Sequence, residues 1–208
     1  MANPNFERQP GRTSRDRKPA KLRSPLPIIL IVCQGEKTEP NYFRSFRVAD
    51  VKILHANGDP MQVVEYAEKA YAKSTECDAV WCVFDFDSFP QFDVAIERVE
   101  NLAAQEKPFH AAWSNECFEL WYLLHFEYLQ SSLNRSAYIG KLTQHLETPY
   151  VKNDQLMRDR LKAKEAVAEE NVKKLKRLHS ESGVTLPSKC CPMTTVGELV
   201  AVLRNARG

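Results

Sequence analysis

The chain has 208 residues, of which 43% are hydrophobic and 27% are charged, and its formal net charge is +2. This length suits one generous domain or a domain with an appendage, and the composition is that of a globular protein with a hydrophobic core. No apolar run approaches the roughly 20 residues that a membrane span requires, and the N-terminus lacks a signal-peptide pattern. We therefore expect a cytoplasmic protein with no membrane partner.

Positive charge is concentrated in residues 1–24, which carry seven Lys or Arg against two Asp or Glu. This charge of +5 leaves −3 on the other 184 residues. Pro, Gly and Ser with almost no apolar content predict a disordered tail. Such a basic arm can contact nucleic-acid phosphates, and we include Arg23 among the candidate contacts. A solvated tail without function is an equally good interpretation.

From Pro27 onward, strand patterns alternate with helical patterns. Pro40 falls early in the first helix, where its missing N–H costs little, and Asp59 is the candidate N-cap of the second. This order predicts an α/β fold with a parallel sheet and right-handed crossovers. The predicted strands are residues 28–33, 51–55, 79–84 and 109–113, and the helices between them are 38–49, 61–74 and 92–107.

Strand patterns stop near residue 130, and the rest of the chain has helical patterns. The longest helix carries eight Lys or Arg and five Asp or Glu, so its polar face is either solvated or binds RNA or a partner. We expect a basic tail at 1–24, an α/β domain at 25–130 and a helical extension at 131–208 packed on it. The helices predicted here are 117–126, 138–146, 154–178 and 194–204, the last capped by Thr194 or Thr195.

The six cysteines are predicted to be reduced and mostly buried thiols. Four of them lie in or beside apolar stretches, and no Cys-x-x-Cys pair occurs. A zinc site built from Cys190, Cys191 and His179 is the alternative.

Carboxylates follow two of the predicted parallel strands. Asp85 and Asp87 come directly after the third strand. Glu36 and Glu39 lie in the glycine-containing turn after the first. Because ligands bind at the carboxyl ends of parallel strands, we expect one acidic edge there. Two close carboxylates repel each other unless a cation lies between them, and Mg²⁺ prefers oxygen ligands.

Both acidic sequences also have an explanation that needs no ligand. An Asp-x-Asp sequence is often a turn with solvated acids, and Thr38 could cap the next helix while Glu39 complements its dipole. Lys37 and the backbone N–H groups around Gly35 add possible phosphate contacts. Metal-assisted phosphodiester hydrolysis uses this combination of carboxylates, a cation and an activated water.

Further residues could face the same edge. Asn115 and Glu119 begin the helix after the fourth strand, although capping and dipole compensation explain them equally well. Lys152 is a weaker candidate for a phosphate contact. Phe118 and Trp121 are expected in the core rather than in a base-stacking platform.

Four motifs, in this order and spacing, resemble those of RloB-like proteins. Residues 33–43, Cys-Gln-Gly-Glu-Lys-Thr-Glu-Pro-Asn-Tyr-Phe, are similar to the opening signature of that family, and residues 84–89 to its acidic motif. Residues 114–126 resemble its Asn-Pro-x-Phe-Glu-Leu-Trp helix, and residues 192–196 its last motif. The resemblance covers about residues 28–204.

The resemblance implies a Toprim-like sheet and a nuclease that uses Mg²⁺ (or Mn²⁺) on RNA or DNA. It also implies a role in bacterial restriction or abortive phage defence, often beside an ABC-type ATPase. Asp85 and Asp87 would hold the ion, with Glu39 as a further ligand. The implied catalytic residues are Glu36, Lys37, Glu39, Asp85 and Asp87, and the candidate nucleic-acid contacts are Arg23, Lys37, Asn115 and Lys152.

Gln34 departs from the family pattern, which has Glu before the glycine, at the position of the Toprim general acid and base. An amide cannot act as a base or as an anionic metal ligand. Three interpretations stay open: Glu36 or Glu39 substitutes, the protein binds nucleic acid without cutting it, or it is a weakened nuclease. An inactive nucleic-acid-binding or ATPase-docking subunit is therefore the alternative function. Phe86 and Glu116 also depart from the pattern, and neither excludes a metal.

Overall fold

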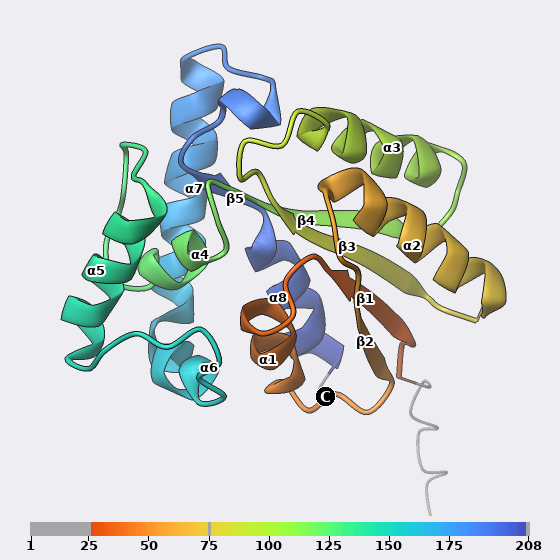
Figure 1. Cartoon of the computed structure of the whole chain (residues 1–208), viewed down its shortest axis with the longest axis horizontal. Coiled ribbons are helices and arrows are strands. Elements are labelled where there is room, and N and C mark those ends of the chain that lie inside the picture. The colour runs from red at the N-terminus through yellow and green to blue at the C-terminus, as the bar shows by residue number, and fades with distance from the viewer. Residues whose placement is uncertain (1–25, 75, 207–208) are drawn as a thin grey trace, which may run out of the picture.

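The computed structural model describes residues 26–74 and 76–206, so the tail at 1–24, with Arg23, lies outside the described residues. The strands are β1 Ile29–Cys33, β2 Val51–His55, β3 Ala79–Asp85, β4 Phe109–Asn115 and β5 Met193–Thr194. They form one sheet in the order β2-β1-β3-β4-β5 (Figure 1). β1 to β4 are parallel, which confirms the predicted α/β fold, and β5 runs antiparallel to β4.

Helices cover both faces of this sheet. α2 (Pro60–Lys73) and α3 (Phe92–Ala104) lie on one face, and α1 (Thr38–Arg44) and α8 (Val196–Ala206) lie on the other (Figure 1). The strands carry apolar residues on both sides, as a doubly covered sheet requires.

The alternation of side chains along β1 explains these two layers. Leu30 and Val32 belong to the hydrophobic core beneath α2 and α3, and Ile29 and Ile31 belong to the core on the other face. The second core also includes Leu203 of α8 and continues into the helices after residue 130. The C-terminal part thus shares a core with the sheet, while the boundary at residue 130 stays a prediction.

Two helix starts follow the predicted capping chemistry. The Asp59 carboxylate accepts the Gln62 backbone N–H at 2.9 Å, and the Gln62 side chain accepts the Asp59 N–H at 2.9 Å. The Val196 N–H donates to the Thr194 hydroxyl at 3.2 Å. The last helix begins at Val196 rather than at residue 194, because Met193 and Thr194 form β5.

The helix predicted at residues 38–49 begins at Thr38 as predicted but has another capping residue and ends earlier. Its N-cap position is Lys37, which makes no side-chain capping bond, so Thr38 is not the cap. It ends at Arg44, and Arg47 adopts a φ of 53°, in the left-handed region that stops a helix.

The long helix predicted at residues 154–178 is broken. It consists of α6 (Met157–Leu161), a 3₁₀ turn η1 (Lys162–Lys164) and α7 (Glu165–Glu181). No Gly or Pro marks the break, which accompanies packing of α6 on the segment after α1: the Arg158 guanidinium lies 3.9 Å from the centre of the Phe46 ring.

The remaining helices are α4 (Glu119–Leu123), α5 (Arg135–Leu146) and the short 3₁₀ turn η2 (Pro187–Lys189). Phe118 and Trp121 are buried, as expected of core residues. In the part of the chain that the structure describes, no helix is long and apolar enough to cross a membrane.

Candidate active site

A cavity of about 400 Å³ opens at the carboxyl ends of β1 and β3. The β1–α1 turn, the loop after β3 and the first residues of α1, α4 and α5 contribute to it. All five residues that the resemblance implies to be catalytic line this cavity. The lining residues are Gln34, Gly35, Glu36, Lys37, Thr38, Glu39, Asp85, Asp87, Phe89, Phe118, Glu119, Arg135 and Lys152.

Asp85 and Asp87 converge on one cation. Asp85 ends β3, and Asp87 follows with a φ of 37°, a left-handed conformation that Asp adopts more readily than most residues. Arg135, the first residue of α5, bridges them. Its Nη2 lies 3.3 Å from Asp85 Oδ2 and 2.9 and 3.0 Å from the two carboxylate oxygens of Asp87. The oxygens of both carboxylates are therefore aimed at one point.

Glu39 is a buried acid in the first turn of α1, only 6% exposed. Its carboxylate lies directly against Gly35, where a Cβ would overlap it, so the glycine makes room for the acid. Burial raises the pKa of Glu39 to about 7, and the charge of Glu119 adds to the rise. A carboxyl group with a pKa near 7 is suited to accept a proton at neutral pH.

The other acids of the cavity repel one another. Burial raises the pKa of Asp85 well above its usual range, and the charges of Glu39, Asp87 and Glu119 raise it further. Glu119 is 3% exposed and accepts a hydrogen bond from the Tyr150 hydroxyl at 3.1 Å. Five acidic and three cationic side chains line the cavity, so acidic groups outnumber cationic ones by two.

Gln34 holds three strand ends together. Its amide N–H donates to the Gly58 carbonyl at 2.8 Å, and its amide oxygen accepts the Asp85 backbone N–H at 3.0 Å. The donor bond needs an amide, because an ionised carboxylate has no hydrogen to donate. The residue at position 34 is therefore part of the scaffold of this edge.

The structure separates the candidate nucleic-acid contacts. Lys37 and Lys152 are exposed and line the cavity. Asn115 is buried outside the lining, and its amide donates to the carbonyls of Pro187 and Ser188 at 3.0 and 3.1 Å. Asn115 thus positions η2 beside the end of β4.

The donor set has the chemistry that Mg²⁺ prefers, although the arrangement is not a ready-made site. In residues 26–74 and 76–206, no group of three or more His, Cys, Asp or Glu side chains is placed to hold a metal ion. Asp85 and Asp87 nevertheless aim carboxylate oxygens at the same point, and Mg²⁺ is often bound by only one or two carboxylates. Arg135 takes that point here, so a divalent cation there requires Arg135 to move aside.

The cysteines match the prediction of reduced thiols. All six are free, and four of them are buried. The His179 Nε2–H donates to the Pro192 carbonyl at 3.0 Å, so this nitrogen is already used within the protein. The zinc alternative at Cys190 and Cys191 therefore receives no support from the described residues.

Arg135 is the site residue that the sequence did not reveal. Its contacts with Asp85 and Asp87 span 50 and 48 positions, and it belongs to a segment without a family motif. The only local signal is the capping residue before it: the Asn134 side chain accepts the Ala137 N–H at 2.9 Å and fixes where α5 begins.

A family model described as RloB-like protein matches residues 29–203 of the chain, most of its length. This match confirms the resemblance and spans the acidic cavity together with the C-terminal helices. No curated protein and no solved structure matches the chain.

Proposed function

The chain belongs to the RloB-like protein family, and on this premise we propose that it is a Mg²⁺-dependent nuclease of bacterial anti-phage defence. Its reaction is hydrolysis of a phosphodiester bond in RNA or DNA, in the cytoplasm, together with an ABC-type ATPase. The Toprim-like character of its sheet is part of this proposal. The family membership supports the class of protein, and the cavity supports the chemistry.

The observation that carries the proposal is the convergence of Asp85 and Asp87 on one cationic atom beside the buried Glu39. These residues come from the ends of two adjacent parallel strands, where ligands of such sheets bind. Three cations, Lys37, Arg135 and Lys152, lie around the same cavity and suit a phosphate group.

Asp85 and Asp87 would hold the divalent cation, with Glu39 within the same cavity as a further ligand or as the base. Mg²⁺ (or Mn²⁺), when bound, stabilises charge on the phosphate and lowers the pKa of a coordinated water. Glu36 lies at the exposed rim, where it could order water.

In the proposed reaction, a water oxygen forms a bond to phosphorus while the bond from phosphorus to the leaving ester oxygen breaks, and the leaving oxygen takes a proton from solvent water. Glu39 accepts the proton of the water, which its pKa of about 7 allows at neutral pH. Lys37 and Lys152 contact the non-bridging phosphate oxygens. Arg135, displaced from the two aspartates, contacts the phosphate together with the two lysines, because its guanidinium can bind two oxygens at once.

The test is cleavage of labelled RNA and DNA by the purified full chain with Mg²⁺ or Mn²⁺, alone and with any ABC-type ATPase encoded beside its gene. Asp85→Asn and Asp87→Asn keep side-chain shape and should abolish cleavage. Asp50→Asn, an exposed position before β2, is the matched control and should cleave like the wild type. Absence of cleavage of tRNA, mRNA and DNA in every condition would remove the proposal.

Gln34 favours a second candidate function, that of an inactive subunit that binds nucleic acid or docks on the ATPase. Both hydrogen-bonding ends of its amide are used within the protein, at Gly58 and Asp85. The discriminating variant is Gln34→Glu. Cleavage that appears only in this variant identifies a site that lacks its base, whereas cleavage by the wild type assigns the base to another residue.

A further inference from the structure

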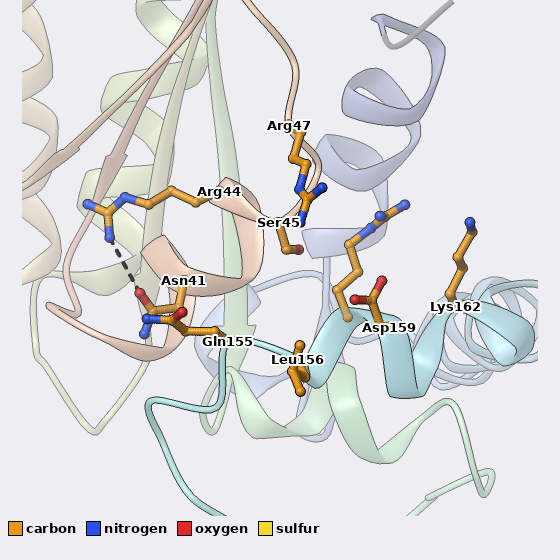
Figure 2. Close-up of a pocket in the computed structure, with 9 residues that line it drawn as sticks. Asn41, Arg44, Ser45, Arg47, Gln155, Leu156, Asp159 and Lys162 are labelled. Carbon is orange, nitrogen blue, oxygen red and sulfur yellow. Dashed lines mark hydrogen bonds between the residues drawn. The ribbon is translucent and has the colours of Figure 1, made fainter.

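A second cavity, of about 480 Å³, lies between the end of α1 and α6, and its lining is basic. Figure 2 shows Arg47 reaching from the α1 side toward α6, while Lys162 and Asp159 extend from the opposite wall. The charged lining residues are Arg44, Arg47, Arg158, Asp159 and Lys162, four cations and one acid, for a net charge of +3.

Arg158 is the buried element of this cavity. It is 5% exposed, lies over the Phe46 ring at 3.9 Å and has Glu165 at 3.7 Å. Its Nε is buried and has no hydrogen-bond partner among the described residues. Because this Nε is buried, a ligand in the cavity does not reach it, and Arg158 contributes its positive charge to the cavity wall.

The exposed cations of the cavity are also free to bind an anion. Arg47 and Lys162 form no ion pair with any residue that the structure describes. Arg44 turns toward Asn41, whose side-chain oxygen is 3.4 Å from its Nη1 (Figure 2). An oxyanion placed between Arg47 and Lys162 would therefore gain two charge-assisted contacts without breaking an existing pair.

We propose that this basic cavity binds a phosphate group of the nucleic-acid strand on which the acidic cavity acts. α1 connects the two cavities, because Glu39 lies in its first turn and Arg44 is its last residue. Its seven residues span about 9 Å, which is roughly three nucleotides of a stacked strand at ~3.4 Å each. The identity of the ligand rests on the proposed function, whereas the anion site rests on the cavity itself.

The experiment measures binding of a fluorescein-labelled 12-nucleotide RNA and DNA to the full chain by anisotropy, in EDTA, between 50 and 200 mM salt. Arg47→Gly keeps the left-handed backbone at this position, and Lys162→Gln keeps the helical segment, so both should fold. Each should weaken binding about threefold to fivefold, as for exposed ion pairs. The double variant loses the neutralisation of one phosphate and should lower the salt slope by about 0.7, the value for one phosphate contact on a single strand.

Two further variants test whether the charge of this cavity controls binding and whether the effect is specific to the cavity. Asp159→Asn removes the one acid of the lining and should tighten binding. Arg177→Gln removes an exposed cation on α7, about 18 Å along that helix from its first residue, and should stay within twofold of the wild type. Equal affinity and salt slope in Arg47→Gly, Lys162→Gln and Arg177→Gln overturns the proposal.

Calorimetry with inorganic phosphate and with AMP separates a strand from a free phosphate compound. Binding of either as tight as that of the oligonucleotide, lost in Arg47→Gly, assigns the cavity to a free compound and overturns the strand proposal. Because no divalent cation is present, the result does not depend on cleavage. If Arg47→Gly weakens strand binding but the wild type does not cleave with Mg²⁺, this inference stands and the nuclease proposal fails. If the wild type cleaves but Arg47→Gly binds the strand as the wild type does, the nuclease proposal stands and this inference fails.

Discussion

Replacing Glu39 with Gln removes a buried charge while keeping the shape of the side chain. A rise of its pKa from 4.5 in the unfolded chain to about 7 in the folded protein lowers the free energy of unfolding by about 3 kcal/mol once the group is ionised in both states. Below pH 4.5 the group is protonated in both states, so the substitution should change little. As the pH rises from 4.5 to 7, the unfolded chain ionises first and the wild type loses stability. Above pH 7 the loss is complete.

The measurement is urea unfolding followed by tryptophan fluorescence, in EDTA, at pH 5 and pH 8. The Glu39→Gln protein should exceed the wild type by up to about 3 kcal/mol at pH 8 and by much less at pH 5. Glu97→Gln on the exposed face of α3 is the control and should change neither value. If Glu39→Gln raises the free energy of unfolding equally at both pH values, or lowers it at pH 8, the raised pKa of Glu39 is refuted.

Two further substitutions test the same cavity. Gly35→Ala places a Cβ on the Glu39 carboxylate and should destabilise the protein by about 1–3 kcal/mol in thermal unfolding; adding Glu39→Ala should recover most of this loss, and a Gly35→Ala protein as stable as the wild type contradicts the contact. Arg135→Gln removes the cation between Asp85 and Asp87 and should tighten Mg²⁺ binding roughly tenfold in calorimetry, about 1.4 kcal/mol. Weaker Mg²⁺ binding in Arg135→Gln would show that the arginine does not compete with the ion.

The fold was predictable where a short stretch of sequence carries a clear pattern. The apolar runs of β1 and β3 and the N-cap residue Asp59 are local patterns, and each produced the element that the sequence predicted. β5 was not predictable, because two residues are too few to show an alternation, and their partners Ser114 and Asn115 lie far away in the sequence. The break between α6 and α7 accompanies packing of Arg158 on Phe46, and no Gly or Pro in the sequence marks it.

The residues of the candidate site also fall into predictable and unpredictable groups. Glu39, Asp85 and Asp87 stand next to strand ends, so topology alone brings them to one edge. Arg135 reaches this edge from a helix some 50 positions away, and no spacing rule announces such a contact. The scaffold role of Gln34 likewise depends on Gly58, which lies beside it only in the folded chain.

The antiparallel pairing of β5 with β4 has a consequence for how the protein is made. Asn115 of β4 pairs with Met193, so the ribosome adds 78 further residues before the partner of β4 exists. At ~5–20 residues per second this takes roughly 4 to 16 s. Throughout that interval the end of β4 that β5 later covers, Ser114 and Asn115, presents unpaired N–H and C=O groups, the kind of exposed edge that recruits strands from other chains. Aggregation during synthesis, rather than instability of the finished protein, is therefore the hazard that this connection creates.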